Sequence, residues 1–363
     1  MGKTIVVSAV NLVEGGPLTI ARECLRYLSS YIADQYEIYA LVNKKGLFPF
    51  ENIHYVEYPA SKRSWVSRLY YEYYYFRKVS QRLKPFLWLS LHDMTPNVTA
   101  GRRAVYCHNA SPFYRVSLKE AMMDPKFALF NKLYKYLYGI NIKKNDFVIV
   151  QQDWLRLRFE KIYGVTRTIV AYPSVHAPSD RWSAGMKSDT RSKFFYPSFP
   201  RIFKNFETIC EAVKILAARG MDDFSVTFTF QGNENRYARS LLRRYGGLRQ
   251  IRFEGLLDRK EVEEYYRDAD CLIFASKLET WGLPISEFKY YGKPMLLSDL
   301  AFSHEAAGDY DKAAFFKPDD AVQLAGLMLD FMTRRLTFLP CRKPDPRPLF
   351  AQNWDQLFKI LLG

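Results

Sequence analysis

The sequence predicts an α/β protein of two domains, each built on a largely parallel sheet. Its 363 residues exceed what one hydrophobic core usually supports, and a hydrophobic share of 48% is enough for two cores. Short apolar runs alternate with segments of helical spacing along most of the chain. This alternation lapses between Ile169 and Phe195, where Pro, Ser and charged residues accumulate. We therefore expect one domain at residues 1–175 and a second at residues 190–345.

The first half opens with a predicted strand, a glycine turn and a helix. The apolar run at residues 4–10 precedes the turn NLVEGGP, and residues 18–32 then place apolar side chains at helical spacing. Such a unit points the N-terminus of its helix toward the carboxyl edge of a sheet. Further strands are predicted at residues 37–43, 54–58, 104–109 and 147–152.

The second half repeats the alternation of strands and helices. Strands are predicted at residues 193–198, 226–232, 251–255 and 271–276, and helices at residues 205–220 and 259–269. Ligands of such folds bind beyond the carboxyl ends of the strands, often between two domains.

The spacing of the cysteines and the lengths of the apolar runs predict the cellular compartment of the protein. The five cysteines are scattered and form no Cys-x-x-Cys pair, which predicts a reduced chain without disulfides or a structural zinc. The first ten residues have the pattern of a strand rather than of an export signal. No apolar run reaches the length of about 18 residues that a membrane-spanning helix needs. We therefore expect a cytoplasmic protein.

Basic residues are concentrated in the first half of the chain. Residues 1–175 hold 25 of the 53 Lys and Arg but only 13 of the 38 Asp and Glu, so they carry +12 of the formal net charge of +15. Such a surface suits nucleic acid, a phosphorylated ligand or an anionic membrane. A basic surface that serves solubility alone remains an alternative.

Two predicted helices in this half combine basic and aromatic residues. Residues 63–84 place Trp65, Leu69, Tyr73, Phe76 and Val79 near one face, and residues 126–139 do the same with Phe127, Phe130, Tyr134 and Leu137. Helices of this kind bind anionic bilayers, with aromatic rings at the interface and cations at the headgroups. They also pack on sheets, and the sequence leaves both readings open.

Residues 276–288, SKLETWGLPISEF, place two carboxylates on either side of an uncharged turn. Glu279 follows a predicted strand, and Glu287 falls in the first turn of a helix that begins near Pro284. The free N–H groups at a helix N-terminus favour a diphosphate, and Gly282 lets the backbone approach it without a Cβ atom. A helix cap at Glu287 and a surface ion pair at Glu279 are the alternative interpretation.

The stretch at residues 251–309 resembles the donor-binding half of glycosyltransferase family 4, whose members are retaining enzymes of GT-B architecture. The resemblance rests on the strand ending Phe253-Glu254-Gly255, the Glu-x7-Glu pair, Gly292-Lys293-Pro294 and the turn from Glu305 to Gly308. A weaker resemblance extends over most of the chain. It implies a GT-B fold, in which two Rossmann-like domains face each other across a cleft, and a C-terminal helix at residues 350–363 that packs back on the first domain.

The resemblance also implies a donor site for a nucleoside diphosphate sugar of UDP or GDP type, without a metal or other cofactor. Glu279 would face the sugar and Glu287 the ribose, while Lys204 would stabilise the leaving diphosphate. This chain has Phe199 where the family pattern has an Arg, so Arg201 is the candidate for that role. The other implied donor-binding residues are Gly15, Gly16, Leu256, Thr280, Trp281, Gly282 and Leu283.

Three residues at strand ends of the first half are candidates for catalysis or acceptor binding. His108 corresponds to a family histidine that points into the cleft near the donor sugar, so we add it to Glu279 and Lys204 as a predicted catalytic residue. An ordinary hydrogen-bonded histidine at a strand end is the alternative. His92 and Asp93 end another apolar run and are predicted, with His108, to meet the acceptor.

The predicted function is the retaining transfer of a sugar from a nucleotide-sugar to a hydroxyl of a glycan acceptor. We expect a bacterial surface glycan, such as lipopolysaccharide O-antigen or capsule, carried on a lipid diphosphate at the cytosolic face of the inner membrane. One alternative is a basic nucleic-acid-binding protein, although the sequence contains no recognised nucleic-acid motif. The other is a GT-B protein without transferase activity that acts as a binding module. Asp268-Ala269-Asp270 is interpreted as a helix–strand junction rather than a metal site.

Overall fold

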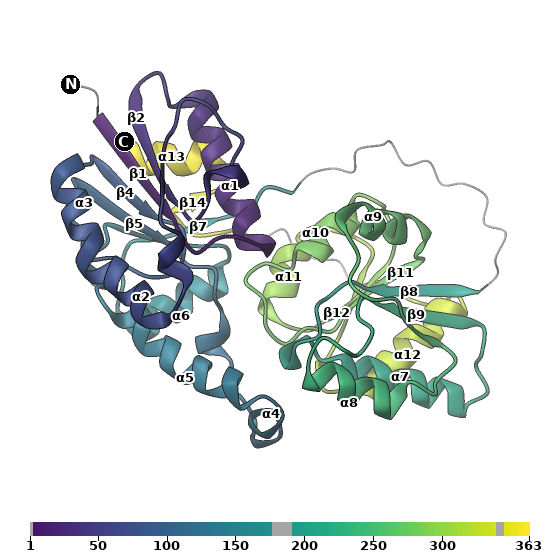
Figure 1. Ribbon diagram of the computed structural model, residues 1–363. Helices are drawn as coiled ribbons and strands as arrows, with labels where there is room; N and C mark the ends of the chain where they lie inside the picture. The colour runs from purple at the N-terminus through teal and green to yellow at the C-terminus, as the bar shows by residue number, and fades with distance from the viewer. Residues whose placement is uncertain (1–2, 176–190, 339–344) are drawn as a thin grey trace. The chain divides into compact units, whose positions relative to one another are not determined.

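The chain folds into two compact α/β units, which a computed structural model describes at residues 3–175, 191–338 and 345–363 (Figure 1). The first unit comprises residues up to 113, residues 130–174 and residues 346–363. The second comprises residues 114–129 and 175–345. Residues 114–129, which the sequence analysis placed in the first domain, therefore group with the second.

Within the described residues, the first unit is built on eight parallel strands in the order β14-β7-β6-β5-β4-β1-β2-β3. Strand β1 (Lys3–Ala9) alternates between the two faces, because Ile5 and Val7 join one hydrophobic cluster while Val6 joins another. The other strands are β2 (Tyr36–Val42), β3 (His54–Glu57), β4 (Leu87–Ser90), β5 (Arg102–Tyr106), β6 (Phe147–Val150), β7 (Thr168–Ala171) and β14 (Phe350–Ala351).

Helices cover both faces of this sheet. Helix α1 (Gly15–Tyr31) and the C-terminal α13 (Trp354–Leu362) lie next to each other (Figure 1) and share one hydrophobic cluster. Within it, the rings of Tyr27 and Phe358 stack with centroids 5.5 Å apart. Helix α3 (Phe76–Leu83) packs on the other face through Phe76 and Val79. The remaining helices of the first half are α2 (Trp65–Tyr70), α4 (Leu118–Met123), α5 (Pro125–Gly139) and α6 (Asp153–Tyr163).

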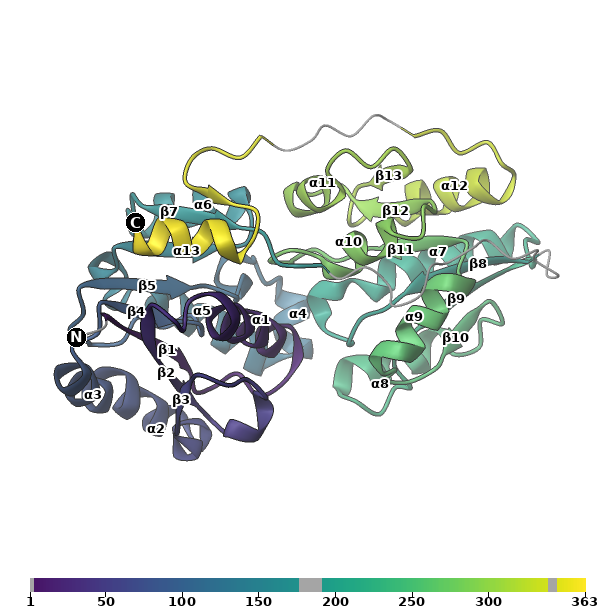
Figure 2. The same ribbon diagram turned by 90° about the horizontal axis from the view of Figure 1, so that it is seen from above.

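The second unit contains a parallel sheet of six described strands in the order β10-β9-β8-β11-β12-β13 (Figure 2). The chain moves from β8 to β9 on one side, and later returns to pair β11 with the other side of β8. Strands β8 (Ser192–Tyr196), β9 (Phe224–Phe228), β10 (Ile251–Phe253), β11 (Cys271–Phe274), β12 (Met295–Ser298) and β13 (Ala313–Phe316) form it. The helices are α7 (Phe206–Ala218), α8 (Arg236–Tyr245), α9 (Arg259–Asp268), α10 (Leu283–Lys289), α11 (Ala301–Ala307) and α12 (Ala321–Met332).

Three local features differ from the sequence-based expectation. The fully buried strand β7 occupies residues 168–171, where the predicted connection was to begin, because Thr168 to Ala171 complete the sheet between β6 and β14. The predicted helix at residues 63–84 is interrupted by a π-helical turn at Tyr71–Tyr75. Helix α1 begins at Gly15, so the paired glycines open the helix instead of preceding it.

The described parts of the chain include no helix that is both long and apolar enough to cross a membrane. The four described cysteines, Cys24, Cys107, Cys210 and Cys271, are buried and free of disulfides. Cys341 lies outside the described residues.

Candidate active site

The strand order of the second unit directs attention to the loops that follow β8 and β11. The chain leaves these neighbouring strands toward opposite sides of the sheet, which makes their carboxyl ends a topological switch point. Loops diverge at such a point and leave room for a ligand. Lys204 lies in the loop after β8, and Glu279 lies in the loop after β11.

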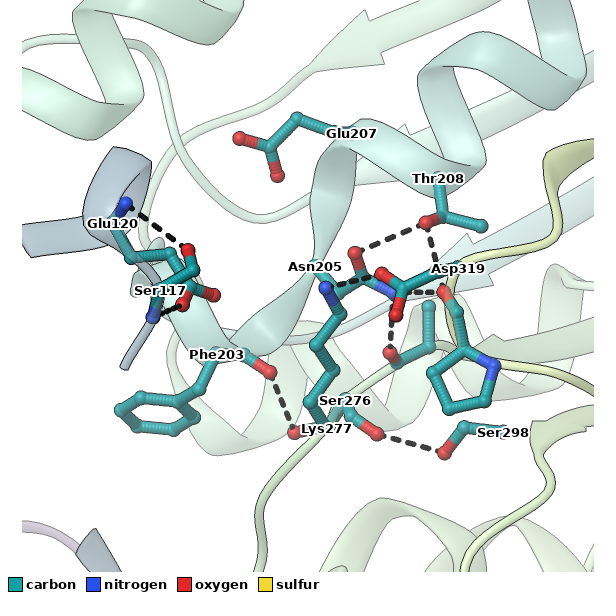
Figure 3. A network of polar contacts seen from close by, with 12 residues as sticks. Ser117, Glu120, Phe203, Asn205, Glu207, Thr208, Ser276, Lys277, Ser298 and Asp319 are labelled. Carbon is teal, nitrogen blue, oxygen red and sulfur yellow. Dashed lines mark hydrogen bonds and ion pairs between the residues drawn. The ribbon is translucent and has the colours of Figure 1, made fainter. Parts of the chain in front are cut away.

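The loop that carries Lys204 is held by a buried asparagine. Residues Ile202–Lys204 form a 3-10 turn, and Asn205 then takes a left-handed conformation with φ of 59° before α7 begins. The Asn205 amide donates to the carbonyls of Ala275 at 3.1 Å and Pro318 at 2.6 Å (Figure 3). Thr208 Oγ1 donates to Asn205 Oδ1 at 3.0 Å. These bonds fix the backbone position from which the Lys204 side chain extends.

The loop that carries Glu279 is tied to the Lys204 loop through the backbone. The N–H of Lys277 donates to the carbonyl of Phe203 at 2.7 Å (Figure 3). Ser276 Oγ donates to the carbonyl of Leu278 at 3.0 Å. The two loops are therefore joined by hydrogen bonds. These bonds hold Lys204 and Glu279 close together, although the two residues lie far apart in sequence.

Lys204 and Glu279 form an ion pair between the two loops. The ammonium group contacts the Glu279 carboxylate, and the two side chains are 17% and 15% exposed. Limited solvent contact strengthens the interaction of each charge with any ligand that reaches it. The pair can therefore present a cation to an anionic leaving group and a carboxylate to a neighbouring hydroxyl or developing positive charge.

The turn between Glu279 and α10 is rigid around two residues of the predicted donor site. Trp281 is buried, and its indole N–H donates to Ser286 Oγ at 2.8 Å. Gly282 has φ of +91°, and a Cβ atom there would lie 3.2 Å from Cδ1 of Ile285. Only glycine adopts this conformation readily. Thr280 and Leu283 are half-buried on either side of this pair.

Glu287 lies on α10 and has two protein partners that the sequence did not reveal. Its carboxylate contacts the guanidinium of Arg259 and accepts a hydrogen bond from Tyr266 Oη at 3.0 Å. Burial, and then the charge of Glu287, raise the pKa of Tyr266 well above its usual value. Since α10 begins at Leu283, Glu287 is its fifth residue and lies just beyond the predicted first turn. The predicted ribose contact would have to share this carboxylate with Arg259.

Arg201 and Leu256 occupy exposed positions. The Arg201 guanidinium lies 5.3 Å from the centroid of the Phe199 ring, and it forms no ion pair with a described residue. Leu256 is 65% exposed and follows Gly255, whose φ is +101°. Both side chains are accessible to a ligand, and their predicted roles in donor binding remain predictions.

A segment from the first half of the chain packs on the Lys204 loop. Phe203 contacts the rings of Phe127 at 5.5 Å and Tyr114 at 6.5 Å between centroids. Helix α4 follows Tyr114 and begins with a capping box formed by Ser117 and Glu120 (Figure 3). Sequence reasoning missed this packing, because the aromatic pattern at residues 126–139 shows only that a face is apolar and not what covers it.

The predicted acceptor residues of the first unit lie at the carboxyl ends of β4 and β5. The Asp93 carboxylate accepts hydrogen bonds from the N–H groups of His108 and Asn109 and from the hydroxyls of Tyr134 and Tyr138. This arrangement gives Asp93 a structural task, because four donors converge on one carboxylate. Gly15 and Gly16 are exposed at the start of α1 in the same unit.

His108 stacks on Tyr106 with ring centroids 4.4 Å apart. Burial lowers the pKa of His108, so its ring is neutral at physiological pH. Its buried Nε2 atom has no hydrogen-bond partner among the described residues. The residue as a whole is only half-buried, but Nε2 itself has almost no exposed surface in this structure.

Ser8, His92 and Glu72 align in the order of a hydrolase triad, but inside the protein. His92 Nε2 lies 2.9 Å from Ser8 Oγ, and His92 Nδ1 lies 3.4 Å from Glu72 Oε1. Ser8 and Glu72 are 0% exposed and His92 is 2% exposed. Burial raises the pKa of Glu72 to about 8 and lowers that of His92 to about 3. The group is a neutral buried contact at pH 7, and in this structure His92 has almost no surface for an acceptor.

The Asp-x-Asp motif at residues 268–270 forms the helix–strand junction that the sequence predicts. Asp268 contacts Lys193 Nζ at 2.9 Å, and Asp270 accepts from the Lys193 N–H at 2.9 Å. Over the residues that the structure describes, no group of three or more His, Cys, Asp and Glu side chains is arranged to hold a metal ion.

Comparison with known proteins identifies the second domain. Residues 179–340 match the family model described as glycosyl transferases group 1. This range contains Lys204, Glu279 and Glu287. The resemblance to glycosyltransferases is therefore confirmed, while the finer assignment to family 4 stays a prediction. A search of curated protein sequences finds no match.

Solved structures share the fold along almost the whole chain. WaaG, a glycosyltransferase involved in lipopolysaccharide biosynthesis, has a TM-score of 0.65 and 14% identity over 91% of this chain and 90% of its own. Sucrose-phosphate synthase from Thermosynechococcus elongatus has a TM-score of 0.65 and 13% identity over 92% and 90%. HepE from Anabaena, solved with UDP-glucose, has a TM-score of 0.56 and 14% identity over 92% and 91%. At these identities the likeness establishes the fold, and the predicted GT-B class of two Rossmann-like α/β domains is confirmed.

Proposed function

Starting from a second domain that matches the group 1 glycosyl transferases, we propose that this protein transfers a sugar from a nucleoside diphosphate sugar to a hydroxyl group of a glycan. The observation that carries the proposal is the Lys204–Glu279 ion pair at the switch point of β8 and β11, inside the matched range. A cation held there neutralises the charge that develops on a leaving diphosphate.

The proposed donor is a UDP or GDP sugar, and each part of it meets a different residue. Lys204, assisted by Arg201, binds the diphosphate, and Gly282 allows the backbone to approach it. Glu279 faces the sugar, Glu287 the ribose, and the base lies near Leu256. The UDP-glucose complex of HepE supports a uridine donor for a protein of this fold, although that nucleotide is a property of HepE.

The proposed reaction retains the configuration of the anomeric carbon. The bond between that carbon and the diphosphate oxygen breaks as a bond to the acceptor oxygen forms on the same face. The proton of the acceptor hydroxyl passes to an oxygen of the leaving phosphate, so no protein nucleophile is needed. Lys204 lowers the energy of the leaving group, and Glu279 stabilises positive charge on the sugar ring, without a metal or other cofactor.

The proposed acceptor is a growing bacterial surface glycan, such as lipopolysaccharide O-antigen or capsule, linked to a lipid diphosphate. His108 is the proposed contact in the first unit, because it is half-buried beyond the carboxyl end of β5, whereas His92 is only 2% exposed. WaaG supports a surface-glycan acceptor for this fold, since it takes part in lipopolysaccharide biosynthesis.

The outward face of α5 supports peripheral contact with an anionic membrane on the cytosolic side. Leu133 and Tyr136 are 52% and 69% exposed on this helix, and Ile140, directly after its end, is 41% exposed. The lysines Lys132 and Lys135 are exposed beside them. Tyr134 and Tyr138 of the same helix are buried, so one face of the helix packs on the protein while the opposite face stays open to solvent. Exposed apolar residues between lysines are typical of helices at anionic bilayers.

Flotation with vesicles tests the membrane contact. The double substitution Leu133→Ser and Tyr136→Ser should reduce co-flotation with vesicles that contain phosphatidylglycerol. Val322→Ser, at an equally exposed apolar residue on α12, is the control. Equal flotation of the double variant and the control would contradict membrane contact through α5.

Thermal denaturation with nucleotides tests the proposed function as a whole. A nucleotide at a hundredfold excess over its Kd stabilises the protein by about 2.7 kcal/mol, which raises Tm by several degrees. We expect such a shift with UDP or GDP, and turnover of at least one matching nucleotide-sugar. Nucleotide binding without turnover of any donor would favour the binding module. No shift with any nucleotide, together with salt-dependent binding of an oligonucleotide, would favour the nucleic-acid-binding alternative.

A further inference from the structure

A cavity of about 480 Å³ opens in the first unit at the carboxyl edge of β1, β2 and β3. Its lining includes Asn43 and Lys44, which follow β2, and Lys62 and Arg63, which follow β3. Leu47 and Pro59 contribute apolar walls. The volume lies within the range of about 300–1,000 Å³ that is usual for small-molecule sites, and this edge of a parallel sheet is where such folds bind ligands.

The walls of this cavity are joined at one backbone carbonyl. The carbonyl of Val10, just after β1, accepts from Asn43 Nδ2 at 3.3 Å and from Ser61 Oγ at 3.4 Å. Ser61 also donates to the carbonyl of Tyr58 at 2.7 Å. Asn43 and Ser61 are buried at 7% and 0% exposure, so these contacts are shielded from water. The segments after all three strands therefore form one rigid support for the charged side chains above them.

Three cations and little opposing charge surround the cavity. Lys62 Nζ lies 3.8 Å from the carboxylate of Glu14, whose side chain is 86% exposed and therefore weakly engaged. Lys44 and Arg63 form no ion pair with any residue that the structure describes. Like charges held on one rigid support repel one another, and an anion between them relieves this repulsion. Arg63 also offers paired N–H donors that match two phosphate oxygens.

We propose that this cavity binds a phosphate or diphosphate group through Lys44, Lys62 and Arg63. The inference rests on the proposed function in one respect, because it identifies the group with the phosphorylated end of the glycan acceptor. Lys204, the cation proposed for the donor diphosphate, belongs to the second unit and does not line this cavity. A phosphate on a soluble glycan and a diphosphate in a lipid headgroup share this chemistry.

Calorimetric titration with inorganic pyrophosphate tests the proposal. The titration uses the full-length protein carrying Lys204→Met, so that binding at the donor site does not obscure the result. Adding Lys44→Gln and Arg63→Gln should weaken pyrophosphate binding about tenfold or more, because two charge-assisted contacts are lost. The matched control adds Arg77→Gln and Lys78→Gln, which remove the same charge from exposed positions on α3. Its affinity should stay within about twofold of the parent, since these charges act only through a screened field.

Three results would overturn the proposal: no pyrophosphate binding by the parent, unchanged binding in the Lys44 and Arg63 variant, or an equal loss in the control. Vesicles with and without phosphatidylglycerol identify the source of the phosphate. A loss of vesicle binding specific to the Lys44 and Arg63 variant assigns the cavity to a lipid headgroup, and pyrophosphate binding without vesicle binding assigns it to a soluble glycan.

Nucleotide titrations keep this proposal separate from the proposed function. They use proteins with Lys204 intact. If the variant of Lys44 and Arg63 binds UDP or GDP normally while pyrophosphate binding is unchanged, only the cavity proposal fails. If the wild-type protein binds no nucleotide, the proposed function fails whatever the cavity binds.

Discussion

Replacing Lys204 by methionine separates the structural and catalytic contributions of its ion pair with Glu279. Methionine keeps most of the apolar stem and removes the charge, which leaves the Glu279 carboxylate 15% exposed without its cation. Removing one partner of a fully buried pair costs about 3–5 kcal/mol, and partial solvent contact here reduces that to about 1–3 kcal/mol in the free energy of unfolding. Loss of one group that stabilises developing charge lowers kcat by about 10²–10³.

The double variant with Glu279→Gln distinguishes the two effects. Glutamine removes the unpaired charge, so the double variant should recover stability relative to Lys204→Met, whereas its activity should stay low. Urea unfolding gives the stabilities, and release of nucleoside diphosphate gives the rates.

Lys277→Met is the matched control for this cycle. Lys277 is 22% exposed, close to the 17% of Lys204, but its partner Asp319 is 81% exposed. We expect a loss of less than about 1 kcal/mol and nearly unchanged turnover. Wild-type turnover in Lys204→Met, or an equal loss in Lys277→Met, would refute the role of Lys204 at the leaving group.

Three further predictions follow from other sites. Glu287→Gln should weaken binding of the donor nucleotide about tenfold by losing charge-assisted hydrogen bonds, as calorimetry would show, and unchanged affinity would remove its ribose role. Gly282→Ala should destabilise the protein by about 1–3 kcal/mol in urea, since alanine is strained at φ of +91°, and a neutral result would show that the turn relaxes. The folded pKa is about 3 for His92 and about 8 for Glu72, so the free energy of unfolding should depend on pH. It should rise from pH 3 to about 4.5, stay level to about 6.5, and fall toward pH 8. Glu72→Gln should abolish the fall above pH 6.5, and an unaltered fall would assign it to other groups.

The sign of the pH effect follows from the two shifts taken separately. The raised pKa of Glu72 means that the folded state holds a proton which the unfolded state has lost, so stability declines as pH rises toward 8. The lowered pKa of His92 means that the unfolded state takes up a proton first, so stability declines as pH falls toward 3. Between the two unfolded-state values the effects oppose each other, which produces the level region.

Local sequence patterns predict those parts of the site that depend on strand ends. Lys204 and Glu279 follow predicted strands, and parallel strands bring their carboxyl ends to one edge, so the fold class places both residues at the same edge of the sheet. Their roles in the donor site are implied only by the resemblance to glycosyltransferases. The contact of Arg259 with Glu287 depends on how α9 and α10 pack, which no periodicity specifies. The π-helical turn that carries Glu72, which is buried beside His92, is likewise not indicated by the spacing of apolar residues.

Elements whose partners are distant in sequence were the ones that the patterns missed. Strand β7 has only four residues, and it pairs with β14, which lies almost 180 residues later in the chain. Its short apolar run was therefore not distinguished from the connection that follows it. The packing of Phe127 on Phe203 joins residues from different halves of the chain. An apolar helix face predicts burial in such cases, but the partner is chosen by the tertiary fold.

A crystal structure with bound UDP or GDP, chosen by the larger thermal shift, tests the central claim most directly. The claim is that the second domain binds a nucleoside diphosphate at the loops after β8 and β11. We predict phosphate oxygens within hydrogen-bond distance of Lys204 Nζ and ribose hydroxyls on the Glu287 carboxylate. A nucleotide bound in the first unit, or one in the second unit away from both residues, would contradict the account.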